Sequence, residues 1–290
     1  MAVVGLCLHP ERKRVVDVAV RAARWLDERG HQVRLSEGDA EIVGMAELGI
    51  ADGCFLAGLD VAVSLGGDGT MLRTVDLVAE AEVPVIGVNL GTLGYLTEVE
   101  PQHVELALER FLAGDHEVEL RMRMSVEVDA PSAFGPTSST VPALNEAVVG
   151  KTPTGQIVRV RVLVDGEQLT TYAADGIIIA TPTGSTAYAW SAGGPIVSPD
   201  HAALLLTPVA PHMLFDRSLV LPPTSCIRLE IASGRPATLS VDGRSLGLLE
   251  EGDAVVCTAA ANPARLVTFE PRNFLRILKA KFGLDDRDVS

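Results

Sequence analysis

The hydrophobic pattern changes its period near Leu120, and no other feature of the 290 residues constrains the fold as strongly. Before that point, short apolar runs alternate with segments whose apolar residues return every three or four positions. This alternation predicts strands joined by helices, and therefore a parallel sheet with right-handed crossovers. From about residue 120 to 260 the apolar residues occupy every second position, as in VRVRVLV at 158–164, which is typical of antiparallel strands.

These patterns predict an α/β domain over residues 1–119, a β-rich domain over 120–260 and a C-terminal segment over 261–290. Enrichment in Pro, Ser and Thr predicts a loop over 131–142, and the end DDRDVS is expected to fray. Residues 36–57 fit no single pattern and leave room for a short helix. The expected strands include 3–8, 33–35, 59–65, 83–89 and 177–180, and the expected helices are 11–28, 70–82, 101–113, 187–191 and 273–282.

Composition excludes several classes of protein. The net charge of −14 argues against non-specific binding to nucleic acid or to an anionic membrane, although a locally positive site could still bind an anionic substrate. No apolar run reaches about 18 residues, so a membrane-spanning helix is not expected. The first residues carry no basic region, so a signal peptide is not expected either. The four cysteines are scattered without metal-ligand spacing, which favours reduced thiols in the cytoplasm.

A glycine turn follows the apolar run Leu59–Leu65. Gly66, Gly67 and Gly69 surround Asp68, and a helical pattern begins at Thr70. We interpret the glycines as positions that take positive φ and let the backbone approach a phosphate at a helix N-terminus. Asp68 would repel a phosphate, so it is interpreted as a base or a metal ligand. The alternative is an ordinary turn in which the aspartate only caps the helix.

A second informative stretch runs from Asp175 to Pro199. Four hydroxyl residues occupy Thr181–Thr186 between a buried strand and a helical pattern, where hydroxyls and N–H groups could bind phosphate or ribose. The alternative is a capped helix start. Asp175 could ligate or could only end the turn with Gly176.

Asn145 and Glu146 interrupt the apolar run VPALNEAVVG. Two polar side chains in an apparent strand are costly to bury without partners. They are interpreted as functional residues, and the alternative is an exposed strand edge.

Three motifs together resemble those of NAD kinases. These are G-G-D-G-T at Gly66–Thr70, A-L-N-E at Ala143–Glu146 and D-G-x-x-x-x-T-P-T-G-S-T-A-Y-x-x-S-A-G-G-P at Asp175–Pro195. The order and spacing match over nearly the whole chain. The glycine turn alone is also similar to that of diacylglycerol kinases and phosphofructokinases, whereas the third motif separates NAD kinases from their lipid-kinase relatives.

The resemblance implies a reaction and a set of partners. The expected reaction transfers a phosphoryl group from ATP to the 2′-hydroxyl of the adenosine ribose of NAD, giving NADP, with a divalent cation, Mg²⁺, as cofactor. The expected fold is an α/β domain with a parallel sheet followed by a β-rich, NAD-binding domain, with the C-terminal helix returning to the first domain. A homodimer or homotetramer in the cytoplasm is expected, without nucleic-acid or membrane partners.

The resemblance also implies roles for individual residues. Asp68 matches the catalytic aspartate that takes the proton from the 2′-hydroxyl. Asn145 and Glu146 match the pair that holds the adenine-side ribose. Asp242 and Arg244 resemble a site-lining turn, and this match is the loosest of the set. The remaining matches are to residues that contact the bound nucleotide: Gly69, Arg73, Asp175, Thr183, Thr186, Ala187, Tyr188 and Ser191.

Two departures from the family pattern leave details open. Ala173 stands where some members have a basic residue, and Gly150–Pro153 replaces a charged pair found in many members. Preference for NAD or NADH and feedback by NADP or NADPH therefore stay open. The sequence also leaves open whether polyphosphate serves as donor. Two alternative functions also stay open, a diacylglycerol-type lipid kinase and a non-catalytic dinucleotide-binding regulator.

Overall fold

The computed structural model describes residues 1–9, 13–91, 94–130, 139–153, 156–232, 234–271 and 273–284. Contacts divide the chain into two compact units. Unit 1 comprises Met1–Leu120 and the segment that begins at Ala264, and unit 2 comprises Arg121–Pro263. The C-terminal segment therefore belongs with the first part of the chain, and the chain passes out of unit 1 and back into it.

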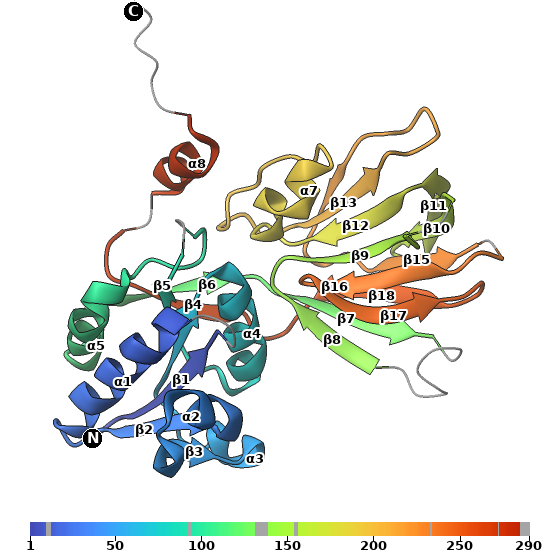
Figure 1. Cartoon of the computed structure of the whole chain (residues 1–290). Helices are drawn as coiled ribbons and strands as arrows, with labels where there is room; N and C mark the ends of the chain where they lie inside the picture. The colour runs from blue at the N-terminus through green and yellow to red at the C-terminus, as the bar shows by residue number, and fades with distance from the viewer. Residues whose placement is uncertain are drawn as a thin grey trace, which may run out of the picture. The chain divides into compact units, whose positions relative to one another are not determined.

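Unit 1 is built on a sheet that, within the described residues, has seven strands in the order β3-β2-β1-β4-β5-β19-β6 (Figure 1). The pairs from β3 through to β19 are parallel, as the strand–helix alternation predicts. The strands are β1 (Val3–Leu8), β2 (Gln32–Ser36), β3 (Gly49–Ile50), β4 (Val61–Gly66), β5 (Val85–Asn89), β6 (Glu117–Arg121) and β19 (Ala264–Thr268).

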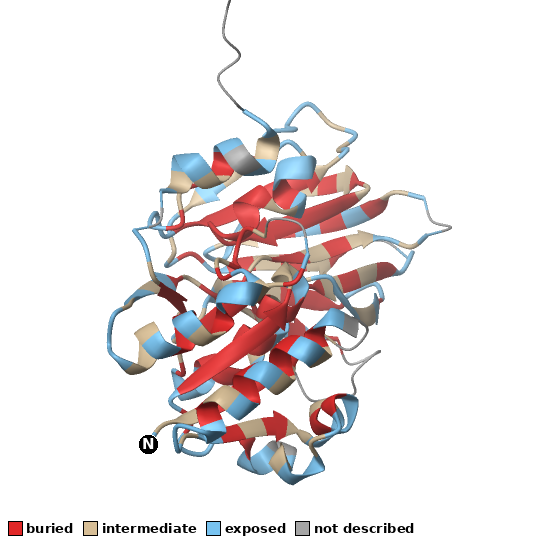
Figure 2. Ribbon diagram, turned by 60° about the vertical axis from the view of Figure 1, so that its left-hand side comes forward, coloured by how far each residue is buried: buried red, intermediate tan, exposed pale blue. Residues whose placement is uncertain are grey.

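Helices lie between these strands and bury one face, so that red and pale blue alternate along them in Figure 2, whereas α8 follows the last strand and is mostly exposed. The helices are α1 (Lys13–Asp27), α2 (Glu37–Val43), α3 (Asp52–Phe55), α4 (Asp68–Val78), α5 (Val104–Leu112) and α8 (Phe274–Phe282), with 3₁₀ turns η1 (Ala46–Leu48), η2 (Ala79–Ala81) and η3 (Pro101–His103).

Alternation along β1 shows how the two faces of the sheet are covered. Val4, Leu6 and Leu8 join the buried cluster formed with α1, α2 and α5. Gly5 points to the opposite face, where a Cβ atom would lie 2.8 Å from the ring of Phe55. Strand β4 is buried along its whole length because both of its faces are covered.

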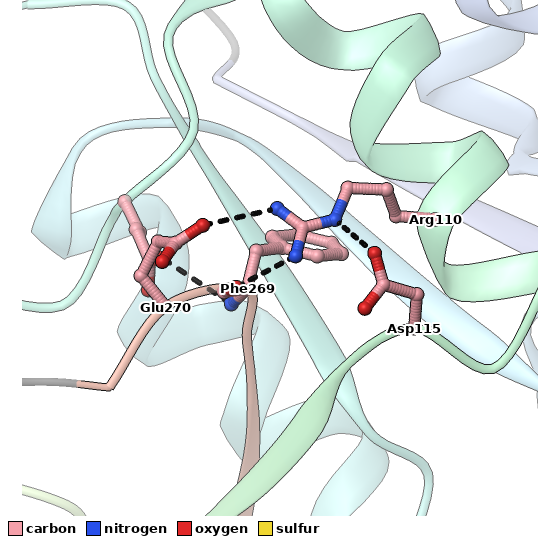
Figure 3. Close-up of polar contacts among 5 residues, drawn as sticks. Arg110, Asp115, Phe269 and Glu270 are labelled. Atoms are coloured by element: carbon pink, nitrogen blue, oxygen red, sulfur yellow. Dashed lines mark hydrogen bonds and ion pairs between the residues drawn. The ribbon is translucent and has the colours of Figure 1, made fainter.

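The C-terminal segment is attached to α5 through Arg110 (Figure 3). Its guanidinium donates to the carbonyl oxygen of Phe269 at 2.8 Å and lies over the ring of that residue. The same group forms ion pairs with Asp115 at 2.6 Å and Glu270 at 3.4 Å. Further along, the ammonium of Lys281 in α8 lies 4.8 Å from the ring centroid of Tyr95. Both contacts lie within unit 1, which confirms the expected return of this segment.

Unit 2 contains two antiparallel sheets, each with six strands among the described residues. Their orders are β11-β10-β15-β18-β7-β8 and β14-β13-β12-β9-β16-β17. The strands are β7 (Met124–Asp129), β8 (Ser139–Ala143), β9 (Glu146–Lys151), β10 (Val158–Val164), β11 (Glu167–Ala174), β12 (Gly176–Ala180), β13 (Leu204–Val209), β14 (Leu219–Leu221), β15 (Ile227–Ile231), β16 (Ala237–Val241), β17 (Arg244–Leu249) and β18 (Ala254–Ala259).

Strand β12 explains why this unit contains both alternating and continuous apolar runs. Ile177 and Ile179 enter the core cluster shared by the two sheets. Ile178 and Ala180 pack on the other face, against Ala189 of the short helix α7 (Tyr188–Ser191). A strand covered on both faces needs apolar residues at every position.

Several predicted elements need correction. The helix expected at 70–82 begins at Asp68 and ends at Val78, followed by η2. The loop expected at 131–142 gives way to strand β8 from Ser139, while 131–138 lie outside the described residues, as do 285–290. The helix expected at 187–191 is the single turn α7, preceded by the 3₁₀ turn η4 (Gly184–Thr186). The ambiguous region 36–57 contains α2, η1, β3 and α3.

Candidate active site

The strand order of unit 1 reverses direction between β1 and β4, and this defines where a ligand is expected. From β1 the chain builds outward through β2 and β3 on one side, and from β4 through β5 on the other. In open parallel sheets, ligands bind beyond the carboxyl ends of the strands at such a switch point. Strand β4 ends at Gly66, directly before the glycine turn, and His9 N donates to Leu65 O across the same edge.

Asp68 is the first residue of α4 and is held by the loop that follows β5. Its Oδ2 accepts the N–H of Tyr95 at 2.9 Å, and its Oδ1 accepts that of Leu96 at 3.0 Å. Gly94 makes this approach possible, because a Cβ there would lie 2.7 Å from Asp68 Oδ1. A carboxylate has about four lone-pair positions, so Asp68 keeps acceptor capacity for a ligand.

The glycines of the turn serve a different purpose from the one expected. Gly66, Gly67 and Gly69 do not take positive φ. Gly66 is needed because a Cβ would lie 2.1 Å from Thr70 Oγ1, whereas nothing lies within 4 Å of the same position at Gly67 and Gly69. The exposed backbone at Gly69 is therefore open to a bound group without the turn being left-handed.

Arg73 lies on α4 and donates from Nη2 to the carbonyl oxygen of Leu8 at 3.0 Å, at the carboxyl end of β1. It lines a cavity of about 220 Å³ with Asp39, Ser36 and Thr70 among its neighbours. Burial raises the pKa of the Asp39 carboxyl, while the N–H of Leu8 and the charge of Arg73 oppose that rise. The switch point thus brings Asp68, Gly69 and Arg73 onto the first turns of one helix.

In unit 2, three segments meet at Asn145. Thr181 N donates to Asn145 O at 2.9 Å, and Thr181 Oγ1 donates to Leu144 O at 2.5 Å. Gly184 packs so closely that a Cβ would lie 2.1 Å from Asn145 O. The third segment is the β16–β17 turn, whose Asp242 accepts N–H groups from Leu144 to Glu146. The two polar motifs expected from the sequence are therefore in direct contact.

The hydroxyl-rich stretch is mostly occupied by bonds within the protein. Thr181, Thr183, Ser185 and Thr186 are all buried. Ser185 Oγ donates to Pro182 O at 2.7 Å and accepts Val197 N, and Thr186 Oγ1 donates to Thr183 O. The binding of phosphate or ribose by these hydroxyls stays a prediction, while several of them already bond within the protein and no side chain caps α7. The hydroxyls shape the loop.

Residues after this loop are more accessible. Tyr188 is 44% exposed, Ser191 is exposed and Ala187 is half-buried. Arg244 opens β17 and is exposed. Thr183 Oγ1 accepts a 3.4 Å bond from Arg121, a buried arginine that the sequence motifs did not single out.

Asp175 does not lie with the other motif residues. It precedes β12, whereas Thr181 follows it, so about 20 Å of strand separates them. Asp175 forms an ion pair with Lys151 at 2.8 Å, and Lys151 N donates to Asp175 O. Lys151 therefore supplies a cation beside Asp175 although Ala173 stands at the position that is basic in some relatives. Only the pairing of β9 with β12 reveals this neighbour.

A divalent cation would have few protein ligands here. The described residues contain no group of three or more His, Cys, Asp and Glu side chains suited to a metal. Mg²⁺ commonly binds through one or two carboxylates together with water and substrate phosphates. Asp68 lies beside the glycine turn and keeps acceptor positions, so it could serve as such a carboxylate ligand.

Comparisons with known proteins match both units. The ATP-NAD kinase N-terminal domain matches residues 4–116, and the ATP-NAD kinase C-terminal domain matches residues 144–269. NAD kinase of Heliobacterium modesticaldum is 42% identical over 97% of this chain and 98% of its own. NAD kinase of Moorella thermoacetica is 39% identical over 96% of this chain and 88% of its own.

Solved structures give the same result. Yeast NADH kinase complexed with NADH superposes with a TM-score of 0.91 at 27% identity, covering 99% of this chain and 89% of the yeast chain. An NAD kinase from Archaeoglobus fulgidus in complex with ATP gives a TM-score of 0.73 at 26% identity, covering 96% and 99%.

The α/β unit with its aspartate-bearing glycine turn and the β-rich unit with its Asn-Glu pair correspond to the two matched domains, so the chain is a two-domain kinase that acts on a nucleotide. Within that class, the family matches are specific. The chain belongs to the ATP-NAD kinase family.

Proposed function

We propose that this chain transfers the terminal phosphoryl group of ATP to the 2′-hydroxyl of the adenosine ribose of NAD, with Asp68 as the base. As a member of the ATP-NAD kinase family, the chain is an NAD kinase that makes NADP from NAD. The observation that supports the finer proposal most directly is the position of Asp68. It is the carboxylate at the switch point, fixed by two backbone N–H groups and still able to accept a hydroxyl proton.

The chemistry needs positioning more than covalent help. An alcohol is a weak nucleophile, and phosphoryl transfer depends largely on alignment and on neutralisation of charge. Asp68 would orient the ribose hydroxyl and accept its proton as the bond to phosphorus forms. Bound Mg²⁺ would supply neutralising charge to the phosphate oxygens of ATP.

Recognition of NAD is assigned to unit 2. Asn145 and Glu146 sit where three backbone segments fix their main chain, which suits side chains that must hold ribose hydroxyls. Glu146 is 8% exposed, so a hydroxyl bonded to it would be largely removed from water. Thr183, Thr186, Ala187, Tyr188 and Ser191 are proposed to line the base-binding part of the same site, with Asp175 and Arg244 as outlying contacts.

Two further expectations from the sequence remain proposals: that the protein forms a homodimer or homotetramer, and that it is located in the cytoplasm. Among the described helices, none is long and apolar enough to cross a bilayer.

Both matching family models describe ATP-NAD kinases, which disfavours the lipid-kinase alternative. A coupled assay for NADP formation from NAD, with ATP and Mg²⁺, tests the function directly. A parallel reaction with diacylglycerol in place of NAD tests the rival acceptor.

Asp68→Asn tests the role of the base. We expect kcat for NADP formation to fall about 10²–10⁴-fold, because the amide cannot accept the hydroxyl proton. KM for NAD should stay within about threefold, since the proposed NAD contacts lie mainly in unit 2. Steady-state kinetics with purified protein give both values.

Asp60→Asn is the matched control. Asp60 also accepts a backbone N–H, that of Val3 at 2.7 Å, but it precedes β4 at the opposite end from Asp68. This variant should keep wild-type kcat. Near-normal turnover by Asp68→Asn would contradict the assignment of the base.

A further inference from the structure

Asp242 makes an unusual set of contacts for a residue in a hairpin turn. Its Oδ1 accepts the N–H of Asn145 at 2.8 Å and that of Glu146 at 3.0 Å, and its Oδ2 accepts the N–H of Leu144 at 2.7 Å. The backbone N–H of Asp242 donates in turn to Glu146 O at 2.9 Å. One carboxylate therefore accepts three successive amides of the segment that carries the Asn-Glu pair.

The backbone around Asp242 is adapted to these bonds. Asp242 has φ of 47° and Gly243 has φ of 76° in the two-residue turn between β16 and β17. A left-handed conformation is uncommon for a residue with a side chain, although Asp tolerates it better than most. The pairing of Val241 with Ala147 then brings the turn alongside the start of β9.

Three successive N–H groups that converge on one point form an anion-binding concavity. Here the protein fills that concavity with its own carboxylate, so these amides are not available to a substrate phosphate. Recognition at this segment is left to the side chains of Asn145 and Glu146. The carbonyl side of the same peptides is held by Thr181, so both sides of the segment are fixed.

We propose that Asp242 is a positioning residue that sets the backbone of Leu144–Glu146 and, through it, the grip of Asn145 and Glu146 on NAD. This inference rests on the proposed function. It extends the loose resemblance of the 242–244 turn to a site-lining turn, because the contacts show Asp242 acting on the protein backbone.

Asp242→Asn is the smallest substitution that tests this role. The amide keeps the size of the side chain but replaces one acceptor oxygen by an NH₂ group, which cannot accept an N–H. Either Leu144 N or the Asn145 and Glu146 amides must then face a donor. Because the displaced backbone carries Asn145 and Glu146 with it, we expect the affinity for NAD to fall about tenfold or more.

Asp165→Asn is the matched control within unit 2. Asp165 also precedes a glycine in a two-residue hairpin turn, has φ of 53°, and accepts the N–H of Cys226 at 2.8 Å. It lies between β10 and β11, in the sheet that does not contain β9, β12 or β16. The chemical change and the expected loss of stability are similar, but no proposed nucleotide contact is near in the fold.

The experiment measures kcat, KM for NAD, KM for ATP, direct NAD binding and the thermal unfolding midpoint of both variants and of the wild type. For Asp242→Asn we expect KM and the dissociation constant for NAD to rise about tenfold or more, with kcat changed less than about threefold. For Asp165→Asn we expect a lowered unfolding midpoint with both kinetic constants within about twofold. Asp242→Glu keeps a carboxylate and should recover part of the NAD affinity; it carries the test if Asp242→Asn does not fold.

The inference is overturned if Asp242→Asn lowers the unfolding midpoint like its control yet leaves NAD affinity unchanged. It is also overturned if kcat falls while KM for NAD does not, because the residue would then act in the chemistry. A wild-type protein that binds NAD without forming NADP would overturn the proposed function alone, since the binding comparison would still decide the role of Asp242.

Discussion

Asp68 and Asp242 are both carboxylates held by backbone N–H groups, yet the number of those groups separates their roles. Asp68 accepts two, one on each oxygen, and keeps capacity for a substrate hydroxyl. Asp242 accepts three and is directed inward at a protein segment. The sequence shows the two residues in similar Asp-Gly pairs. Their roles differ because different backbone amides lie opposite each carboxylate, and the residue type alone does not show which amides these are.

The cysteines provide a prediction about single residues. Burial raises the pKa of the Cys257 thiol to about 12 and that of Cys7 to about 12. Cys54 and Cys226 are exposed. Because the thiolate is the reactive form, we expect a thiol reagent at pH 8 to modify two cysteines rapidly and two slowly. A shift from pKa 9.0 to about 12 lowers the thiolate fraction about a thousandfold.

Mass spectrometry of the labelled peptides over time identifies the order of modification. Unfolding in denaturant should make all four thiols react at one fast rate. Rapid labelling of Cys257 in the native protein would contradict the buried position of this thiol in the core of unit 2.

At the scale of elements, the strand–turn–helix from β4 to α4 shows why a glycine needs coordinates to interpret. The sequence indicates a flexible turn, and the structure shows that only Gly66 is sterically required there. The side chain that would clash with a Cβ at Gly66 belongs to Thr70, four residues further along the chain. Gly94 has a comparable role against Asp68 but stands in a loop whose course the sequence does not reveal.

Gly66→Ala should therefore destabilise the protein by about 1–3 kcal/mol, because the new methyl group must displace Thr70 from the first turn of α4. Gly67→Ala is the control, since nothing lies within 4 Å of its Cβ position and its φ is −122°. That variant should unfold within about 0.5 kcal/mol of wild type. Urea unfolding followed by circular dichroism measures both. Equal midpoints for the two variants would refute the steric argument.

How far the sequence predicts an element depends on how local its cause is. The predicted bounds of β1 equal the observed ones, and β12 is found from its apolar run. Both predictions succeed because a strand buried on both faces needs apolar side chains at consecutive positions. The internal bonds of the hydroxyl-rich loop could not be predicted, for the opposite reason. Its hydroxyls bond to carbonyl oxygens such as Leu144 O, 37 positions away, and such partners leave no local pattern.

For the whole molecule, the change of hydrophobic period near Leu120 lies close to the point where the contacts divide, between Leu120 and Arg121. The insertion of β19 between β5 and β6 could not be read from spacing, because sheet order is a long-range property. Likewise, the ion pair of Lys151 with Asp175 follows from strand pairing alone. Motif order identified the family, whereas contacts assigned each residue its neighbours.

Arg110→Gln tests what holds the two parts of unit 1 together. The Arg110 guanidinium lowers the pKa of the Asp115 carboxyl through a hydrogen bond and its charge. A depressed pKa in the folded state means that this stabilisation is present above the unfolded value of about 3.9 and is lost as pH falls below it. The variant should be less stable than wild type at pH 7, and the difference should shrink towards pH 3.

Some difference should persist in acid, because Arg110 also donates to the carbonyl oxygen of Phe269. Limited proteolysis at pH 7 should release the segment after Phe269 faster in the variant. Arg29→Gln is the control, since Arg29 lies over Trp25 and its contacts are local. A gap between Arg110→Gln and wild type that widens on acidification would contradict the Asp115 pairing.

The interleaved order of strands has a consequence for biosynthesis. When a ribosome has delivered residues 1–121, the sheet still lacks β19, which belongs between two strands already made. Until that strand emerges, β5 and β6 have a gap between them, whereas every strand of unit 2 precedes it in the chain. We therefore expect nascent chains arrested just before Ala264 to show a protease-resistant second unit and an incomplete first one.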